Sequence, residues 1–225
     1  MGPEELRIVV FTVEMAALAT AVILIPGVAA AFLLARYQGP GKGALDTLLS
    51  LPLVLPPTVV GFLLLELLAR NRPLGAWLAG RGIEVVFTGK AVVLATAVMA
   101  FPLLVRSART AFEEVDPRLV GLARTLGAGP VAAFFRVTLP LAWRGVLAGT
   151  VLAFSRALGE FGATIMVAGN IPGRTQTLAL AIFHDVQIGR DDRALGLAAV
   201  TVGLAFVALW TTEWIVRRRV RRDET

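Results

Sequence analysis

Five apolar runs divide this chain, and most of its charged residues are gathered in the segments between them. The runs cover approximately residues 8–35, 48–68, 90–108, 144–168 and 194–216. Crossing the hydrocarbon core of a bilayer takes about 20 helical residues, so four runs are long enough and the third is slightly short. With 56% hydrophobic and 17% charged residues, the chain is too apolar for an ordinary soluble domain. We therefore expect an all-α, multi-pass membrane protein with about five transmembrane helices.

The number of spans depends on two weaker segments. The third run has only 15 uncharged residues, 91–105, and Pro102 interrupts them. Basic residues flank this stretch and can extend their charges to the membrane surface, so it is retained as a span. Residues 175–188 are the candidate for a sixth span, but their apolar core, 178–183, is too short to cross and favours a re-entrant or interfacial helix.

The distribution of basic residues predicts the orientation, because Lys and Arg are enriched on the cytoplasmic side of membrane proteins. With the N-terminus outside, 13 basic residues lie inside and eight lie outside. The inner set is Arg36, Lys42, Arg106, Arg109, Arg118, Arg124, Arg136, Arg144 and the five arginines of residues 217–222. We expect a protein of the inner (cytoplasmic) membrane whose C-terminus is cytoplasmic. Its basic tail directly follows an apolar run, so membrane lipid is the expected partner and nucleic acid is not.

Several kinds of site are excluded by the residue types that the sequence lacks. The chain has no cysteine and one histidine, His184, which cannot form a zinc site alone. The glycine-rich residues 39–43 have neither the spacing nor the Ser or Thr of a phosphate-binding loop. No Ser/His/Asp arrangement is evident around His184. We therefore assign no catalytic residue, metal or cofactor to this chain and expect it not to hydrolyse ATP.

The basic connection 106–143 contains the signals of a capped helix. Asp116 followed by Pro117 predicts a helix N-terminus, and Gly127 suits the position just after a helix C-terminus. Four apolar residues between these signals recur at helical spacing and share one face: Leu119, Leu122, Ala123 and Leu126. A short amphipathic helix of this kind fits either a groove of another protein or the inner leaflet of the membrane.

Basic and apolar residues surround this predicted helix. Arg118 and Arg124 lie off its apolar face. A second short helix is expected to begin at Pro130, and Leu139-Pro140 is expected to turn the chain into the fourth span.

The same connection resembles a loop motif shared by permease subunits of bacterial ABC importers. The match consists of Gly127, nine intervening residues and Val137-Thr138-Leu139-Pro140, while the upstream Glu-Ala-Ala part is kept only at Ala123. In that family the helix inserts into a cleft of the cytoplasmic ATPase and transmits its movement to the membrane helices. The resemblance implies a set of ATPase-coupling residues: Pro117, Arg118, Leu119, Leu122, Ala123, Arg124, Leu126, Gly127, Val137, Leu139 and Pro140.

The fourth run carries an arginine and a glutamate at hydrocarbon depth, which is costly unless they face protein or water. Arg156 and Glu160 are four residues apart and can form an ion pair, with Thr164 one turn further along the same helical face. The pair can hold two helices together, or Arg156 can offer its charge to an anion. The first role is favoured, because Glu160 would repel an anion. In either case this face is expected to border a transport path.

Prolines interrupt the second run, which contains Pro52, Pro56 and Pro57. They remove backbone hydrogen bonds and form either a simple kink or a gate, two readings of equal weight. The candidates for a translocation path are Pro56, Pro57, Thr58, Ser155, Arg156, Glu160 and Thr164. Gly145 and Gly149, four residues apart, permit close helix packing.

A narrower resemblance, to molybdate permease subunits and their sulfate-permease relatives, covers residues 51–62, 155–164 and 168–177. The motif Ile-Pro-Gly-x-Thr, which begins at Ile171, favours molybdate over sulfate as the cargo. The resemblance implies that residues 1–225 form a single transmembrane permease domain with the type I ABC importer fold. It further implies import of molybdate or tungstate by alternating access. Sulfate or thiosulfate is the alternative cargo, and an ATPase-independent secondary transporter is the alternative from a different class.

The resemblance and the small number of spans also imply partners. Five helices are few for enclosing a route across the bilayer, so a second copy of the chain is expected. A cytoplasmic ABC ATPase dimer would hold ATP and Mg. A periplasmic or extracellular oxyanion-binding protein would dock on the outer segments 69–89 and 169–193.

Overall fold

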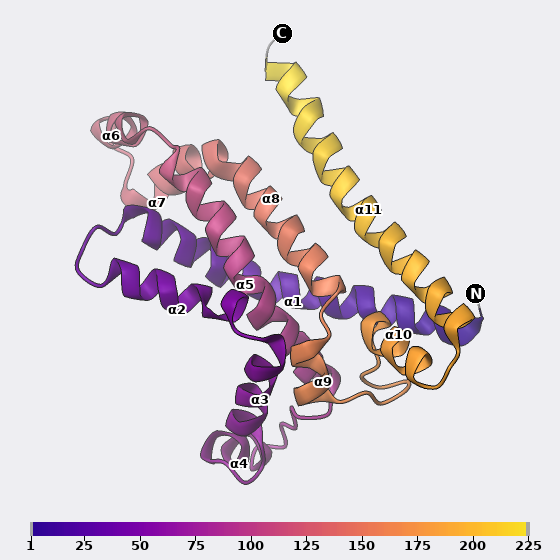
Figure 1. Cartoon of the computed structure of the whole chain (residues 1–225). Helices are drawn as coiled ribbons and strands as arrows, with labels where there is room; N and C mark the ends of the chain where they lie inside the picture. The colour runs from indigo at the N-terminus through magenta and orange to yellow at the C-terminus, as the bar shows by residue number, and fades with distance from the viewer. Residues whose placement is uncertain (1, 224–225) are drawn as a thin grey trace.

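The computed structural model describes the backbone of residues 2–223 and the side chains of residues 2–210. Every regular element in this part of the chain is helical, which confirms the all-α prediction. The elements are α1 (Pro3–Arg36), α2 (Lys42–Val54), α3 (Pro57–Leu68), α4 (Pro73–Ala79), α5 (Gly89–Glu113), α6 (Pro117–Thr125), α7 (Pro130–Ala133), the π-helical η1 (Phe134–Thr138), α8 (Leu139–Leu158), α9 (Gly162–Ala168), α10 (Leu178–Gln187) and α11 (Asp191–Asp223) (Figure 1). The side chains of the basic tail, 217–222, lie outside the described residues.

Within the described residues, four helices are long and apolar enough to cross a membrane: α1, α5, the continuous helix Pro130–Leu158, and α11 over Asp191–Trp210. The bent pair of α2 and α3 makes a fifth if it is counted as one span. Helix α10 has only 10 residues, in agreement with the expectation that 175–188 does not cross. The predicted number of about five spans is therefore consistent with the structure.

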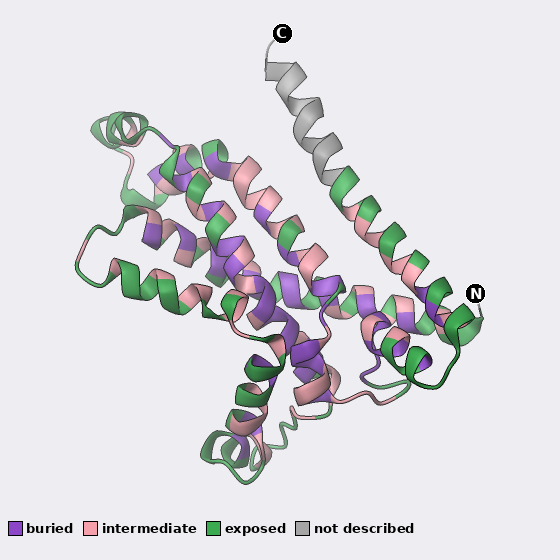
Figure 2. Ribbon diagram, in the orientation of Figure 1, coloured by how far each residue is buried: buried purple, intermediate pink, exposed green. Residues whose placement is uncertain are grey.

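Helix α5 lies at the centre of the bundle, although its sequence looked like the weakest span. It is an uninterrupted helix of 25 residues that packs against α1 and α8, and its buried residues form a continuous stripe (Figure 2). The contact between α5 and α8 is close because Gly145 and Gly149 of α8 face α5. A Cβ on Gly145 would overlap Ala111, and Ser107 Oγ donates a hydrogen bond to the Gly145 carbonyl at 3.0 Å. Small residues lower the mean hydropathy of a membrane helix, but they allow helices to pack as closely as α5 and α8 do.

The second predicted span, 48–68, is divided into two helices at its prolines. Helices α2 and α3 meet at 107°, far beyond a simple kink. Leu55 and Pro56 have extended ψ values of 143° and 132° between the helices, and Pro57 begins α3, where its missing N–H costs no helical hydrogen bond. Pro52 remains inside α2. The break therefore follows from Pro56-Pro57.

The boundaries of the fourth predicted span, 144–168, are also wrong. The helix begins at Pro130 and runs through α7, η1 and α8 to Leu158. Leu139-Pro140 does not turn the chain, because the π-helical residues 134–138 change the hydrogen-bond pattern just before the proline, which has no N–H to donate. Because α5 extends to Glu113 and the next membrane-spanning helix begins at Pro130, the connection between them is shorter than the predicted 106–143.

Candidate functional site

Helix α6 projects from one end of the bundle, opposite the end where α4 lies (Figure 1). Its start is capped as predicted: the Asp116 carboxylate accepts a hydrogen bond from the Arg118 N–H at 2.8 Å. Its end is followed by Gly127, whose φ of +89° is the left-handed conformation that favours glycine. Local sequence signals therefore set both ends of this helix.

The leucines of α6 face away from the bundle. Leu119, Leu122 and Leu126 are 45%, 60% and 80% exposed. Ala123 is half-buried, and α6 packs against α7 and η1. An exposed apolar stripe on a short helix beside basic residues is typical of a helix that docks into another protein.

The predicted coupling residues fall into two groups. The residues of α6 and its caps, Pro117 to Gly127, form the projecting part. Val137, Leu139 and Pro140 lie behind it in the helix that enters the membrane, where the first two are half-buried. The predicted coupling residues thus divide into an exposed contact surface on α6 and a supporting group in the helix behind it.

An aromatic cluster joins this support to two other helices, and the sequence reasoning missed it. The ring centroid of Phe134, in η1, lies 4.7 Å from the ring centroid of Phe32 in α1 and 6.0 Å from that of Phe112 in α5. Phe32 and Phe112 are 5.6 Å apart in an edge-to-face arrangement. Phe134 stands out in the sequence as half of a Phe-Phe pair. Its partners Phe32 and Phe112 lie about a hundred and about twenty residues earlier in the chain, and no local signal identifies them. The cluster connects the base of α6 to α1 and α5.

Two segments that carry the candidate path residues cross at a pair of glycines. A Cβ on Gly61 of α3 would lie 2.5 Å from the Ala163 carbonyl oxygen of α9. A Cβ on Gly162 would lie 2.7 Å from the Pro57 Cβ and 3.3 Å from the Thr58 nitrogen. The backbones of α3 and α9 are therefore in direct contact. The break in the second span is thus packed against the break that follows α8.

The predicted Arg156–Glu160 ion pair is present. Arg156 Nη2 lies 2.7 Å from Glu160 Oε2, in a charge contact that is not aligned as a hydrogen bond. Glu160 Oε1 accepts a hydrogen bond from the Ala163 N–H at 2.8 Å. The Glu160 side chain is 1% exposed and that of Arg156 is 29% exposed. A buried carboxylate held by a guanidinium and a backbone N–H is electrostatically compensated.

Thr164 does not continue the helical face of Arg156, and this prediction is wrong. Helix α8 ends at Leu158 and α9 begins at Gly162, so the spacing of 3.6 residues per turn does not extend across residues 159–161. Thr164 Oγ1 and Ser155 Oγ are buried and make no hydrogen bond within the described residues. A buried hydroxyl without a partner costs about 1–3 kcal/mol, so this region is suited to water or another polar group.

Comparison with known proteins identifies the family. Residues 14–221 match the model of the family described as "Binding-protein-dependent transport system inner membrane component". The chain belongs to this family. It is a multi-pass permease of the inner membrane.

Relatives of the permease include two proteins named "Molybdenum transport system permease protein ModB". The one from Escherichia coli K12 is 46% identical over 95% of this chain and 94% of its own length. The one from Haemophilus influenzae is 43% identical over 85% of each chain. The "Sulfate transport system permease protein CysW" of Synechocystis is 35% identical over 92% of this chain and 75% of its own. The predicted resemblance is therefore confirmed.

Solved structures confirm the predicted fold. The permease superposes on a chain of a bacterial alginate ABC importer with a TM-score of 0.76, at 16% identity, over 97% of this chain and 80% of that chain. For the MetNI methionine ABC transporter the TM-score is 0.72, at 16% identity, over 97% and 99% of the two chains. The fold is that of the type I ABC importer permeases.

The structure brings only some of the path candidates of the permease together. Pro57 lies against Gly162 at the α3–α9 crossing, Glu160 is bonded to the first turn of α9 at Ala163, and Thr164 follows in the same helix. Pro56, which precedes α3, and Thr58, in its first turn, are exposed, whereas Ser155 and Arg156 lie half-buried at the end of α8. Burial and packing distinguish these groups, and sequence spacing does not.

Proposed function

We propose that the permease is the membrane subunit of an ATP-driven importer that moves molybdate across the cytoplasmic membrane by alternating access. The observation that carries this proposal is the 46% identity, across nearly the whole chain, to a molybdenum permease of Escherichia coli. Tungstate is proposed as a second cargo, since it is a tetrahedral oxyanion as well. Sulfate remains the alternative cargo, supported by the 35% identity to a sulfate permease.

Coupling to ATP hydrolysis is assigned to α6. Its exposed leucines would enter a cleft of a cytoplasmic ATPase dimer, which holds ATP and Mg, while Arg118 and Arg124 flank the contact. A displacement of α6 would reach α1 and α5 through Phe134 and its two aromatic neighbours. The coupling helix must contact the ATPase differently in the two states, because equal binding shifts no equilibrium.

A second copy of the chain is proposed to complete the path. Helix α2 has no buried residue, and the large apolar side chains of the broken span, including Leu48, Val54, Phe62 and Leu63, are exposed in the single chain. A symmetric dimer would cover part of this surface and place the route along its twofold axis. The N-terminus lies outside in this arrangement, and α6 and the C-terminus are cytoplasmic.

The α3–α9 crossing is the proposed wall of the path. Because Glu160 neutralises Arg156, this region presents little net charge, and an anion would pass it without being bound tightly. Selectivity is then assigned to an external binding protein that captures the oxyanion.

Uptake by proteoliposomes tests the proposed function. Vesicles that hold the permease and its ATPase, supplied with the loaded binding protein and internal ATP, are expected to accumulate radioactive molybdate. Vesicles with the permease alone should accumulate none, and ATP-independent flux through it would favour a secondary transporter. Unlabelled tungstate should compete in the same assay. Stronger competition by sulfate than by tungstate would favour the sulfate alternative.

A further inference from the structure

A cavity of about 620 Å³ lies between the first turns of α1 and the segment that leads into α10 (Figure 1). Its wall on α1 includes four residues that recur at helical spacing and share one face: Arg7, Val10, Phe11 and Glu14. The opposite wall comes from the segment before α10 and includes Arg174. A cavity of this size is typical of a site for a small molecule or a headgroup.

Glu14 is a carboxylate within the apolar run of a membrane-spanning helix. It lies seven residues after Arg7 in α1, which is roughly 10 Å along the helix axis. Its side chain is exposed, and within the described residues it forms no ion pair or hydrogen bond. A charge at this depth is costly unless it meets a counter-charge. Because helical side chains point toward the N-terminus, the carboxylate is directed along the cavity toward the membrane surface.

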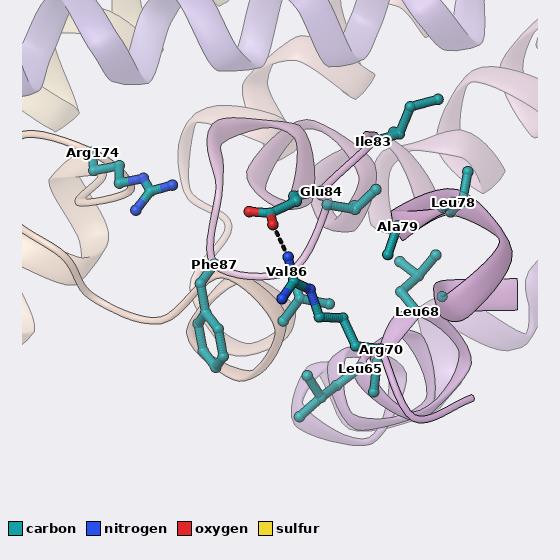
Figure 3. Close-up of a pocket in the computed structure, with 13 residues that line it drawn as sticks. Leu65, Leu68, Arg70, Leu78, Ala79, Ile83, Glu84, Val86, Phe87 and Arg174 are labelled. Atoms are coloured by element: carbon teal, nitrogen blue, oxygen red, sulfur yellow. Dashed lines mark hydrogen bonds and ion pairs between the residues drawn. The ribbon is translucent and has the colours of Figure 1, made fainter. Parts of the chain in front are cut away.

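Arg174 is an exposed cation on the other side of the same cavity. In the part of the chain that the structure describes, its guanidinium forms no ion pair or hydrogen bond. It also borders a cavity of about 410 Å³ between α3 and α4, but there Glu84 is already paired with Arg70 (Figure 3). Arg174 and Glu14 thus line one cavity as separate, uncompensated charges of opposite sign.

The segment that carries Arg174 is fixed against α1. The Leu178 N–H donates a buried hydrogen bond to Thr12 Oγ1 of α1 at 2.9 Å. Closer to the arginine, the fully buried Thr175 accepts a hydrogen bond from the Ile171 N–H at 3.0 Å. The two walls of the cavity are therefore already in place, which lowers the entropic cost of binding a ligand between them.

The charges of the lining favour a ligand that carries both signs. Glu4 also lines the cavity, but Arg193 lies 3.3 Å from its carboxylate and compensates it. Arg7 is exposed and has no partner within the described residues. The uncompensated groups are therefore two guanidiniums and the Glu14 carboxylate. A simple anion would be repelled by Glu14, and a simple cation by the arginines.

An exposed apolar stripe continues from the cavity along α1. Leu18, Val22 and Ile25 follow Glu14 at helical spacing on the same face, and their side chains are 45%, 60% and 80% exposed. Charges of both signs therefore lie at the top of a continuous apolar track on a membrane helix. A phospholipid has this form, with its charges in the headgroup and its chains below.

We infer that the cavity binds the headgroup of an aminophospholipid, phosphatidylethanolamine. Arg174 and Arg7 would hold the phosphate, the ammonium would donate to Glu14, and an acyl chain would lie along Leu18 and Val22. The carboxylate provides the selectivity. The quaternary ammonium of phosphatidylcholine has no N–H to donate to it, and phosphatidylglycerol carries no cation at all.

The lipid belongs to the outer leaflet if the N-terminus lies outside, as proposed above. The inference requires only that α1 spans the membrane, so it does not depend on the cargo or on the ATPase. By bridging α1 to the segment before α10, the bound lipid would stabilise this end of the bundle.

Native mass spectrometry of the purified full-length permease tests the inference, because it resolves single bound lipids. The parent is expected to bind phosphatidylethanolamine about tenfold more tightly than phosphatidylcholine or phosphatidylglycerol with the same acyl chains. Glu14→Gln should raise the Kd for phosphatidylethanolamine about tenfold without raising that for phosphatidylglycerol. Arg174→Gln should raise the Kd for all three lipids, since each carries a phosphate.

Asp192→Asn and Arg190→Gln are the matched controls, because both residues are exposed near the start of α11 and neither lines the cavity. Each should change the three Kd values by less than about twofold. Glu14→Gln and Arg174→Gln should keep the thermal midpoint of the parent without added lipid. Both should lose the additional stabilisation that phosphatidylethanolamine gives the parent.

Three results would overturn the inference. The first is an unchanged order of lipid affinities in Glu14→Gln and Arg174→Gln. The second is displacement of the lipid by an equal concentration of free phosphoethanolamine, which has the same charges without the chains. The third is a change in self-association or in affinity for a protein partner while lipid binding stays the same, because protein would then be the occupant. The two substitutions lie on different elements, so either variant that folds decides the test.

Discussion

The guanidinium of Arg156 and the carboxylate of Glu160 meet where α8 ends, with Nη2 2.7 Å from Oε2. The carboxylate is also bound to the Ala163 N–H, so one buried acid joins α8 to the start of α9. The i, i+4 spacing of the pair predicts the contact, but only the helix break explains why Glu160 has a second partner. The pair is a structural joint beside the proposed path.

Removing either charge of this pair should destabilise the permease. Arg156→Gln leaves a buried carboxylate without its counter-charge, and Glu160→Gln leaves an arginine unpaired at membrane depth. We expect a lower thermal midpoint for each single variant, and a loss in the double variant smaller than the sum by about 1–3 kcal/mol. Thermal unfolding of the four proteins in nanodiscs measures this coupling. Strictly additive losses of stability in the double variant would contradict an interaction between Arg156 and Glu160.

Side chains at the α3–α9 crossing should interfere with both folding and transport. Gly61→Ala would place a Cβ 2.5 Å from a backbone oxygen, which cannot move away cheaply. We expect a destabilisation of about 1–3 kcal/mol and reduced molybdate uptake. Gly203→Ala in α11 is the control, because a Cβ there meets nothing within 4 Å and should stabilise the helix by up to about 1 kcal/mol. Equal behaviour of the two variants would refute a tight crossing.

Gly127 tests the coupling helix through its backbone. A Cβ at this position meets nothing within 4 Å, so the effect of a substitution comes from the φ of +89°. Gly127→Val should cost about 1–2 kcal/mol locally and displace the end of α6, whereas Gly127→Asn tolerates the left-handed conformation. We expect Gly127→Val to lower ATPase assembly and uptake and Gly127→Asn to retain most of both. Co-purification of the ATPase and vesicle uptake measure the difference. Unimpaired assembly and uptake with Val would remove the assigned role of α6.

An ion pair tethers α2 to the bundle. Arg109 Nη1 lies 2.5 Å from Asp46 Oδ1, and Arg109 Nε donates to Glu113 Oε1 at 2.8 Å. Since α2 buries no residue, Asp46→Asn should loosen it and increase amide hydrogen exchange across residues 42–54. Glu113→Gln is the control, because it alters the same arginine within α5 and should leave exchange in α2 unchanged. Similar exchange in both variants would argue against the tether.

Local signals predicted the elements whose ends depend on a few neighbouring residues. The Asp116 cap, the proline after it and Gly127 define α6, and all are visible in the sequence. The boundaries failed where helices interrupt one another. Hydropathy merged α8 with α9 and α2 with α3, because a break of two or three residues hardly changes the average of an apolar window.

The sequence by itself determined that this chain is a multi-pass helical membrane protein, that a capped amphipathic helix lies in the connection before the fourth span, and that Arg156 can pair with Glu160. Run length, capping and helical spacing are local properties, and they survive in any packing of the spans. Tertiary structure decided the 107° break, the glycine crossing of α3 and α9, and the Phe32–Phe112–Phe134 cluster. These features depend on contacts between residues far apart in the chain, and burial and close packing select those contacts only when the helices assemble.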